Sequence, residues 1–388
     1  MEHNCEMAHF WFDGDCSVSM PMRKLLLASF GTVEQTFEQS DEAIRRCLDV
    51  HFDMQTIDRL LNRRTGSYLE EELLKLRERN ITVLYPEHPL YPEKLKHIYD
   101  MPRMLFARGK IRESLNYYNQ TIAIVGARDA DTYSREATRV FARELAKKGI
   151  QIASGLAKGI DSQAHIGCME AGGYTIAVLG CGINVTYPRA NVELYTEIER
   201  KGLILSEYGL DVPPNNFQFP LRNRIISGIS DGVLVACAKK KSGSLITADH
   251  ALEQGKQVYA FPGRPLDTFS EGTNHLIQLG AMCVTRPKDI LCDLWGEEKL
   301  FAGETSERTD AVPYSEDRFV LPDEAIVSEK LTPDEKRLYR LIRLDPVHVD
   351  ALIEQSRLGV RNTISILYEL ERNGFIKQSA PGYYILNL

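Results

Sequence analysis

The segment 154–165, SGLAKGIDSQAH, contains the residues that could take part in chemistry most directly. Asp161 and His165 are four residues apart, so on a helix they share one face, where a carboxylate and an imidazole could act as a general base. No nucleophile and no set of metal ligands accompanies the pair. We therefore favour a structural role, in which Asp161 caps free N–H groups at a helix start beside a buried His165.

The same segment could also bind phosphate. Gly155 and Gly159 let a ligand approach the backbone closely, and Ser154 and Lys158 can donate hydrogen bonds to phosphate oxygens. The segment follows the apolar run IQIA, so it leaves the end of a predicted strand.

A glycine turn also follows the apolar run TIAIV, where Gly126, Ala127 and Arg128 stand before a predicted helix. Backbone N–H groups at such a helix start form a natural anion site. Asp129 and Asp131 stand where the later glycines of a G-x-G-x-x-G sequence would be, which argues against a dinucleotide site. A plain turn between strand and helix is an equally good interpretation.

The strongest basic pattern is FQFPLRNRIISGIS at 217–230, in which Arg222, Asn223 and Arg224 stand just after Phe219. Guanidinium groups beside aromatic rings suit a phosphate backbone with stacked bases. Arginine at a helix start opposes the helix dipole, and an anionic ligand would relieve that cost.

Two weaker segments complete the set of candidates. Arg189 lies in GCGINVTYPRAN at 180–191, after the apolar run TIAVL, and could meet a phosphate. Ser242, Gly243 and Ser244 follow three lysines and enter a helix, where hydroxyl and backbone N–H groups can face an anion.

The elements that position these residues are short runs rich in Val, Ile and Ala, which alternate with amphipathic stretches between 121 and 285. This pattern predicts an α/β fold, a Rossmann-like, doubly wound parallel sheet covered on both faces. Ligands of such sheets bind at the carboxyl ends of the strands. Arg128, Lys158, Arg222 and Arg224 should therefore line one groove.

The flanking segments predict further domains. Residues 1–115 show helical spacing and predict a small helical domain of the SAM or helix-hairpin-helix kind, before a Rossmann-like domain at 116–296. Residues 297–330 hold ten acidic and four basic residues and predict an acidic linker. Residues 331–388 predict a winged helix, because three short helices precede a β-hairpin.

Composition excludes several classes of protein. The 388 residues are 43% hydrophobic and 26% charged, as in soluble proteins, and lack the apolar run of about 18 residues that a membrane span needs. The eight cysteines form no C-x-x-C pair, so we expect no zinc site, no disulfide framework and a cytoplasmic location. The net charge of −7 argues against general nucleic-acid affinity, but much of the acidity lies in 297–330, which leaves room for a local phosphate site.

Five segments, in this order, resemble the DNA-processing protein A family (DprA, also called Smf): GAR at 126–128, SGLAKGIDSQAH, FPLRNRIISGIS, SGSLITADHALEQGKQVYAFPG and EGTNHLIQLGA. The resemblance covers about residues 121–292. It implies a non-enzymatic, cofactor-free homodimer that binds single-stranded DNA, protects incoming DNA and loads the RecA recombinase in natural transformation and recombination. Under this interpretation Asp161 and His165 are structural, and the expected DNA-binding residues are Gly126, Ala127, Arg128, Ser154, Gly155, Lys158, Gly159, Arg189, Phe219, Arg222, Asn223, Arg224, Ser242, Gly243 and Ser244.

The sequence departs from the family pattern at two places. Ala127 stands where the family usually has serine, which removes one hydroxyl contact and leaves the backbone N–H. Ser17, Val18 and Ser19 stand where the family often has a Gly-hydrophobic-Gly hairpin, so we expect no DNA contact from the N-terminal domain.

Two other functions remain open. A phosphoribohydrolase-like, nucleotide-processing enzyme could use the same Rossmann variant, but its Pro-Gly-Gly-x-Gly-Thr loop is replaced here by SGSLITADHALEQ. A transcription factor could use the winged helix, but Glu369 and Glu371 offset Arg361 and Arg372 in its recognition helix.

Overall fold

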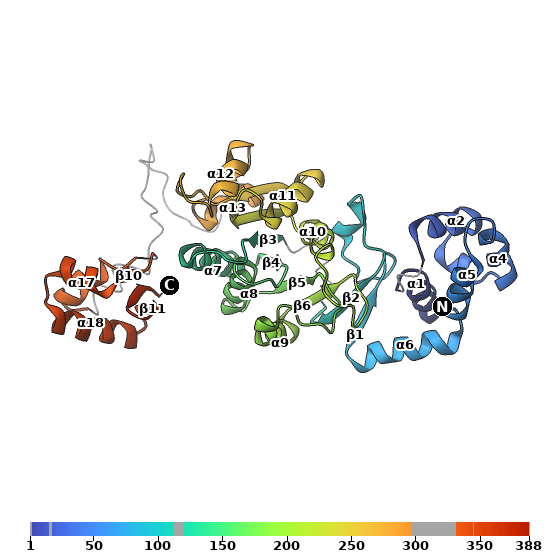
Figure 1. The fold of residues 1–388 in the computed structure, drawn as a ribbon, viewed down its shortest axis with the longest axis horizontal. Coiled ribbons are helices and arrows are strands. Elements are labelled where there is room, and N and C mark those ends of the chain that lie inside the picture. The colour runs from blue at the N-terminus through green and yellow to red at the C-terminus, as the bar shows by residue number, and fades with distance from the viewer. Residues whose placement is uncertain (1, 15–17, 112–119, 297–330, 344, 388) are drawn as a thin grey trace, which may run out of the picture.

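The computed structural model describes residues 2–14, 18–111, 120–296, 331–343 and 345–387, and Figure 1 shows their arrangement. The N-terminal helical part comprises α1 (Glu2–His9), the π-helix η1 (Phe10–Gly14), α2 (Met20–Phe30), α3 (Val33–Phe37), α4 (Asp41–Leu48), α5 (Met54–Asn62) and α6 (Gly66–Glu78). Ser19 caps α2 through its side chain, whereas Ser17 of the expected hairpin lies outside the described residues.

The first residues of the chain form part of the core of this helical part. Trp11 and Phe12 of η1 are buried, and the indole N–H of Trp11 donates to the carbonyl of Leu60 over 2.9 Å. The first residues are thus a packed element of the helical part, although the amphipathic pattern of α1 is weak.

A nine-stranded sheet forms the centre of the molecule, with strand order β1-β2-β6-β5-β4-β3-β7-β8-β9. Its strands are β1 (Ile81–Leu84), β2 (Leu105–Gly109), β3 (Thr121–Gly126), β4 (Gln151–Ser154), β5 (Thr175–Leu179), β6 (Leu203–Ser206), β7 (Gly232–Cys237), β8 (Gln257–Ala260) and β9 (Met282–Cys283). The strands from β6 to β9 pair in parallel, which confirms the predicted α/β, Rossmann-like class.

The first two strands change the expected division into domains. β1 pairs with β2 and β2 with β6, both antiparallel, so the residues before 116 supply two strands of the central sheet. The predicted boundary between 115 and 116 divides this sheet, and the helical part ends with α6 instead. Sequence periodicity could not show this, because two short strands look alike in either domain.

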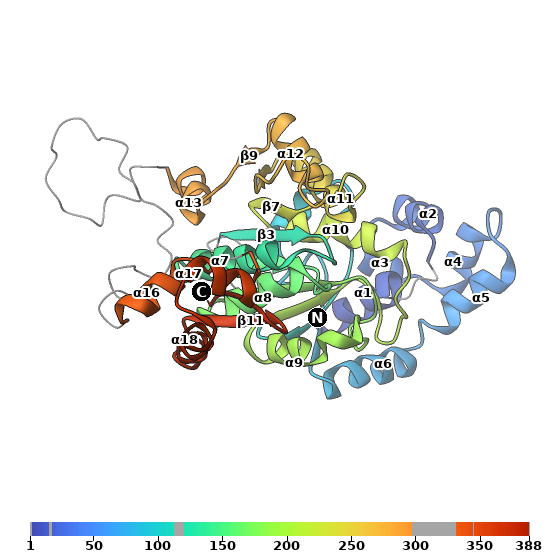
Figure 2. The same ribbon diagram turned by 60° about the vertical axis from the view of Figure 1, so that its left-hand side comes forward.

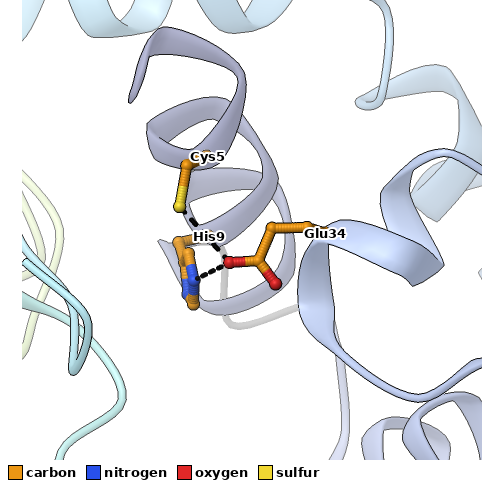
Figure 3. Close-up of side chains that lie close together, drawn as sticks. All are labelled: Cys5, His9 and Glu34. Atoms are coloured by element: carbon orange, nitrogen blue, oxygen red, sulfur yellow. Dashed lines mark hydrogen bonds and ion pairs between the residues drawn. The ribbon is translucent and has the colours of Figure 1, made fainter. Parts of the chain in front are cut away.

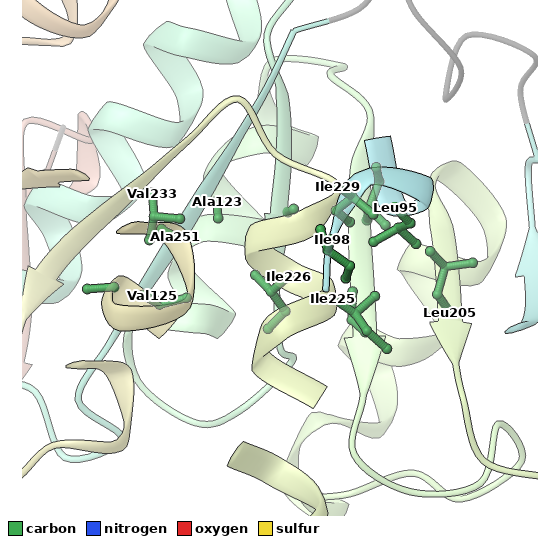
Figure 4. Packing of buried hydrophobic residues seen from close by; sticks show 14 of the residues in the cluster. Leu95, Ile98, Ala123, Val125, Leu205, Ile225, Ile226, Ile229, Val233 and Ala251 are labelled. Carbon is green, nitrogen blue, oxygen red and sulfur yellow. The ribbon is translucent and has the colours of Figure 1, made fainter. Parts of the chain in front are cut away.

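Helices cover both faces of the sheet (Figures 1 and 2). Successive strand residues alternate between the faces, as Ile122 and Ala123 do in β3. One face packs against α7 (Thr132–Lys147), α8 (Ile160–Glu170) and α13 (Pro287–Trp295), and the other against η2 (Glu93–His97), α10 (Gln218–Gly228), α11 (Gly243–Glu253) and α12 (Glu271–Gln278). Figure 4 shows this second layer, in which Ile225 and Ile226 of α10, and Ile229 just after it, lie near Leu95 and Ile98.

The C-terminal part forms the predicted winged helix. It comprises α16 (Pro333–Tyr339), β10 (Val347–His348), α17 (Val349–Ser356), α18 (Val360–Arg372), β11 (Ile376–Ala380) and β12 (Tyr383–Leu386) around its own apolar core. Lys377 contacts Glu136 of α7 over 2.8 Å. The predicted acidic linker at 297–330 lies outside the described residues. Across the described ranges, every helix is too short or too polar to span a bilayer.

Candidate functional site

The strand order places a groove at the switch point of the sheet. The chain passes from β3 to β4 on one side, whereas β7 joins β3 on the other, and ligands of open α/β sheets bind where the order reverses in this way. Two adjoining cavities of about 400 and 430 Å³ lie there, and we call them together the strand-end groove. Arg128, Ala157, Phe219 and Arg222 line both cavities.

Most of the expected binding residues meet in this groove. Those that line it are Gly126, Ala127, Arg128, Gly155, Lys158, Arg189, Phe219, Arg222, Asn223, Ser242, Gly243 and Ser244. Asn216, Lys239, Lys241 and Thr247 also line it and were not singled out as site residues. The lysine run before Ser242 was a visible signal for two of them, whereas nothing in the sequence marked Asn216.

An aromatic and cationic stack forms the centre of the groove. The rings of Tyr187 and Phe219 are stacked with their centroids 5.5 Å apart, and the guanidinium carbon of Arg128 lies 5.2 Å from the centroid of Phe219. Arg128, Lys158, Arg189 and Tyr187 are exposed to solvent. A flat ring beside exposed cations can hold a base and its phosphate together.

Arg222 lies beneath this surface and is 5% exposed. Its guanidinium donates hydrogen bonds to the carbonyls of Val178 and Gly155, the latter over 2.9 Å, so it connects the ends of β4 and β5. A Cβ atom at position 155 would lie 2.6 Å from this guanidinium, which explains the need for glycine there. Most of the donors of Arg222 are therefore used inside the protein.

Arg224 does not face the groove, contrary to the expectation. It is 8% exposed, and its guanidinium pairs with Glu207 over 2.7 Å and with Asp100 over 3.1 Å. Residues two apart on a helix do not face the same side, and α10 therefore directs Arg222 and Arg224 differently.

Ser154 and Ala127 also differ from the expectation. The hydroxyl of Ser154 is fully buried and donates to the carbonyl of Ile124 over 2.6 Å, so it connects two strands instead of facing a ligand. The backbone N–H of Ala127 donates to the carbonyl of Cys237 over 2.8 Å and is not available to a phosphate. Both groups stand at strand ends, where hydrogen bonds of the sheet compete with ligand contacts.

Asp161 holds the loop between β4 and α8. Its carboxylate accepts hydrogen bonds from the backbone N–H groups of Gly155, over 3.1 Å, and Ala157, over 3.4 Å. Burial raises the pKa of Asp161, and the nearby charge of Arg222 and these hydrogen bonds act against that rise. The carboxylate thus fixes a loop that includes the left-handed residue Leu156, at φ +56°, instead of capping α8 itself.

His165 is fully buried and has a separate partner. Its Nδ1 lies 2.6 Å from the hydroxyl of Thr175, which itself donates to the carbonyl of Ile152. Because that hydroxyl proton is already used, Nδ1 carries the proton of a neutral ring and is the donor. Burial, and to a smaller extent the charge of Arg222, lowers the pKa of His165 to about 3. His165 and Asp161 therefore have separate structural partners. The ring forms a hydrogen bond with Thr175, while the carboxylate of Asp161 accepts hydrogen bonds from the loop backbone.

Gly159 lies where the loop between β4 and α8 packs against the turn at Ala127 and Arg128. Its φ is +81°, and a Cβ atom there would lie 2.4 Å from the carbonyl oxygen of Ala127. We expect Gly159→Ala to lower the free energy of unfolding by about 2 kcal/mol, because backbone strain and displacement of the 127–128 turn act together. Urea unfolding would measure this loss.

Gly172→Ala is the matched control. Gly172 has φ +68° with no atom within 4 Å of the added Cβ, so only the strain of the left-handed backbone remains, about 1 kcal/mol. Equal losses in the two variants would show that contact between the loop and the turn contributes nothing.

Fold and site together define a class: α/β proteins with a cationic, aromatic groove at the switch point of a mostly parallel sheet and a winged helix behind it. A family model described as DNA recombination-mediator protein A matches residues 82–294, more than half of the chain. A second, described as the DprA winged helix domain, matches residues 322–382 and begins within the predicted linker. The chain belongs to the DNA recombination-mediator protein A family, which confirms the resemblance seen in the sequence.

Individual relatives agree with this assignment. Protein Smf of Escherichia coli is 37% identical over 326 residues, which cover 82% of this chain and 80% of the relative. DNA processing protein DprA of Streptococcus pneumoniae is 45% identical over 203 residues, 52% of this chain and 71% of the relative. Its solved structure aligns with a TM-score of 0.63 at 35% identity and covers 75% of this chain and 97% of that one.

A structure of DNA processing protein A from Helicobacter pylori, described for its single-stranded DNA binding mode, has a TM-score of 0.50 and 32% identity. It covers 55% of this chain and 95% of that one.

Proposed function

We propose that this protein binds single-stranded DNA along the strand-end groove, without base specificity. The observation that carries the proposal is the stack of Tyr187 and Phe219 beside the exposed Arg128, at the switch point of the sheet. Every base has a face that can stack on a ring, and every nucleotide has a phosphate, so this combination suits any sequence. The Helicobacter pylori relative, described as binding single-stranded DNA, supports the same assignment.

The contacts divide between two kinds of residue. Arg128, Lys158 and Arg189 supply charge to phosphates, and Phe219 with Tyr187 supplies a surface for bases. Arg222 contributes by holding the loop that carries Lys158, and Arg224 has no direct part in this binding. Gly126, Gly155, Asn223 and Ser242–Ser244 form the wall of the groove.

The wider role rests on family membership. We propose that the protein acts in the cytoplasm as a homodimer, protects incoming DNA and helps to load RecA during transformation and recombination. A nucleotide-processing activity is less well supported, because Asp161 and His165 are occupied with the backbone and with Thr175.

The two kinds of contact should respond differently to salt. Arg128→Ala should weaken binding of a fluorescent oligothymidine and reduce the slope of log affinity against log salt by about 0.7, because one phosphate contact is lost. Phe219→Ala should cost about 1–3 kcal/mol of binding free energy with an unchanged slope, because stacking is not ionic. Fluorescence anisotropy at several salt concentrations would measure both.

Matched controls lie close by. Phe217 is 61% exposed, two residues before Phe219, and does not line the groove, so Phe217→Ala should bind like the wild type. Arg200, exposed at the far end of α9 (Val192–Lys201), is the control for charge. Wild-type affinity in Arg128→Ala and Phe219→Ala, or an equal loss in the controls, would place binding elsewhere.

A further inference from the structure

A cluster of side chains in the N-terminal helical part lies away from the strand-end groove. Cys5 and His9 are one turn apart on α1 and point from the same face of that helix. Glu34, in the first turn of α3, reaches across to both of them, as Figure 3 shows. Thiol, imidazole and carboxylate are the three ligand types that zinc sites in proteins use.

The distances within the cluster are those of atoms around one ion. Oε1 of Glu34 lies 3.3 Å from Sγ of Cys5 and 3.1 Å from Nε2 of His9, and the three ligand atoms all lie within 4.8 Å of one another. With zinc–ligand bonds of about 2.0–2.3 Å, neighbouring ligands of a tetrahedral site stand about 3.3–3.5 Å apart. Only small side-chain shifts would therefore admit an ion.

The surroundings of His9 hold its ring in place. The ring is 3% exposed and stacks on Tyr85, with centroids 4.4 Å apart and an angle of 10° between the planes. Nε2 faces the cluster, while Nδ1 is buried and lies 3.8 Å from Oδ2 of Asp13, with no hydrogen-bond partner among the described residues. A metal-binding histidine usually donates its second N–H to a carboxylate, and Asp13 stands on that side of the ring, beyond hydrogen-bond distance.

A further carboxylate and an entry path lie beside the cluster. Oε2 of Glu87, in the loop after β1, lies 3.2 Å from Nε2 of His9. The side chains of Glu87 and Glu34 are 61% and 38% exposed, so an ion can reach the site from solvent.

We propose that Cys5, His9 and Glu34 form a zinc site, with Glu87 or a water molecule as the fourth ligand. A thiolate together with an imidazole favours zinc over magnesium or calcium, which prefer oxygen ligands alone. The ion would join α1, α3 and the loop after β1, and so fix the helical part against the sheet. Residue spacing does not reveal the site, because Glu34 and Glu87 are far from the C-x-x-x-H pair along the chain.

The test uses the full-length protein, freed of metal with a chelator and then titrated with zinc against a chromophoric competitor. We expect binding of one ion, and cobalt in its place should give the ultraviolet thiolate-to-cobalt charge-transfer band. Cys5→Ser should abolish that band, and both Cys5→Ser and Glu34→Gln should lower zinc affinity by at least about a hundredfold, since even residues behind the ligands cost 10–100-fold. Zinc should raise the melting temperature of the wild type and not of Cys5→Ser.

Cys47→Ser is the matched control, because Cys47 lies in the same helical part and bonds to Ser29 instead. It should retain both the cobalt band and the zinc affinity. Failure of the wild type to bind zinc would overturn the site. Equal affinity in the wild type, Cys5→Ser and Glu34→Gln would mean an adventitious ion only and would also overturn it. Glu34→Gln keeps the size of the side chain and a hydrogen-bonding oxygen, so it tests the ligand without depending on whether Cys5→Ser folds.

Discussion

Replacing Arg222 with alanine should lower the free energy of unfolding by about 3–5 kcal/mol. The guanidinium is buried, bonds to the carbonyls of Gly155 and Val178, and is the positive charge that acts most strongly on the buried carboxylate of Asp161. Alanine would leave both carbonyls without their donor and the carboxylate without a compensating charge. Urea unfolding, monitored by circular dichroism, would measure the loss.

Arg200→Ala is the control, because it measures how much the loss of an exposed arginine changes the free energy of unfolding. Arg200→Ala removes a surface pair with Glu197 and should change the free energy of unfolding by less than about 1 kcal/mol. If Arg222→Ala were as stable as Arg200→Ala but failed to bind DNA, Arg222 would be a direct DNA ligand instead. A loss of DNA binding in Arg222→Ala is therefore informative only under conditions in which the variant is shown to be folded.

Acid should destabilise the wild type more steeply than a His165→Asn variant. The pKa of His165 falls from 6.5 to about 3 on folding. As the pH falls below 6.5, His165 is therefore protonated in the unfolded chain, whereas in the folded chain it stays neutral down to about pH 3. The stability that this ring contributes is complete above pH 6.5 and is lost as the pH falls. Between about pH 7 and pH 4 the loss from this one group amounts to about 3 kcal/mol.

Urea unfolding at several pH values would measure this difference as a slope. Asparagine keeps a donor near the position of Nδ1 but cannot titrate, so His165→Asn should lack this part of the acid dependence whatever its stability at neutral pH. Thr175→Val is the control, because it removes the partner of His165 and keeps the buried ring, so the steep dependence should remain. Equal slopes in the wild type and His165→Asn would show that this ring does not control the acid transition.

Much of the sheet could be predicted because its strands are buried on both faces. Runs such as TIAIV and IQIA are apolar throughout, and only a parallel sheet between two helical layers places such runs without exposed positions. The glycine segments that follow them had to lie at one edge, so the groove and many of its residues could be located. The edge strands β1 and β2 were assigned to the wrong unit because pairing between distant strands leaves no local pattern.

The direction of individual side chains was harder to predict. Ser154 and Arg222 stand at the right places for ligand contacts, yet the neighbouring strands use their donors first. Helix geometry alone could have shown that Arg222 and Arg224 do not share one face, because they are two residues apart. Asn216 lines the groove from a loop, where neither periodicity nor a motif indicates where a side chain points.

The two edges of the sheet restrict how copies of this protein can associate. β9 at one edge has only two residues and β1 at the other has four, so little backbone is available for a strand of a second molecule to pair with. Dimers would then form through contacts between side-chain surfaces. Such contacts differ from those of an open edge strand, whose backbone can form hydrogen bonds with another strand in more than one register. Such contacts can be weakened by single surface substitutions that leave the fold intact, and they give the monomer little tendency to extend into fibres.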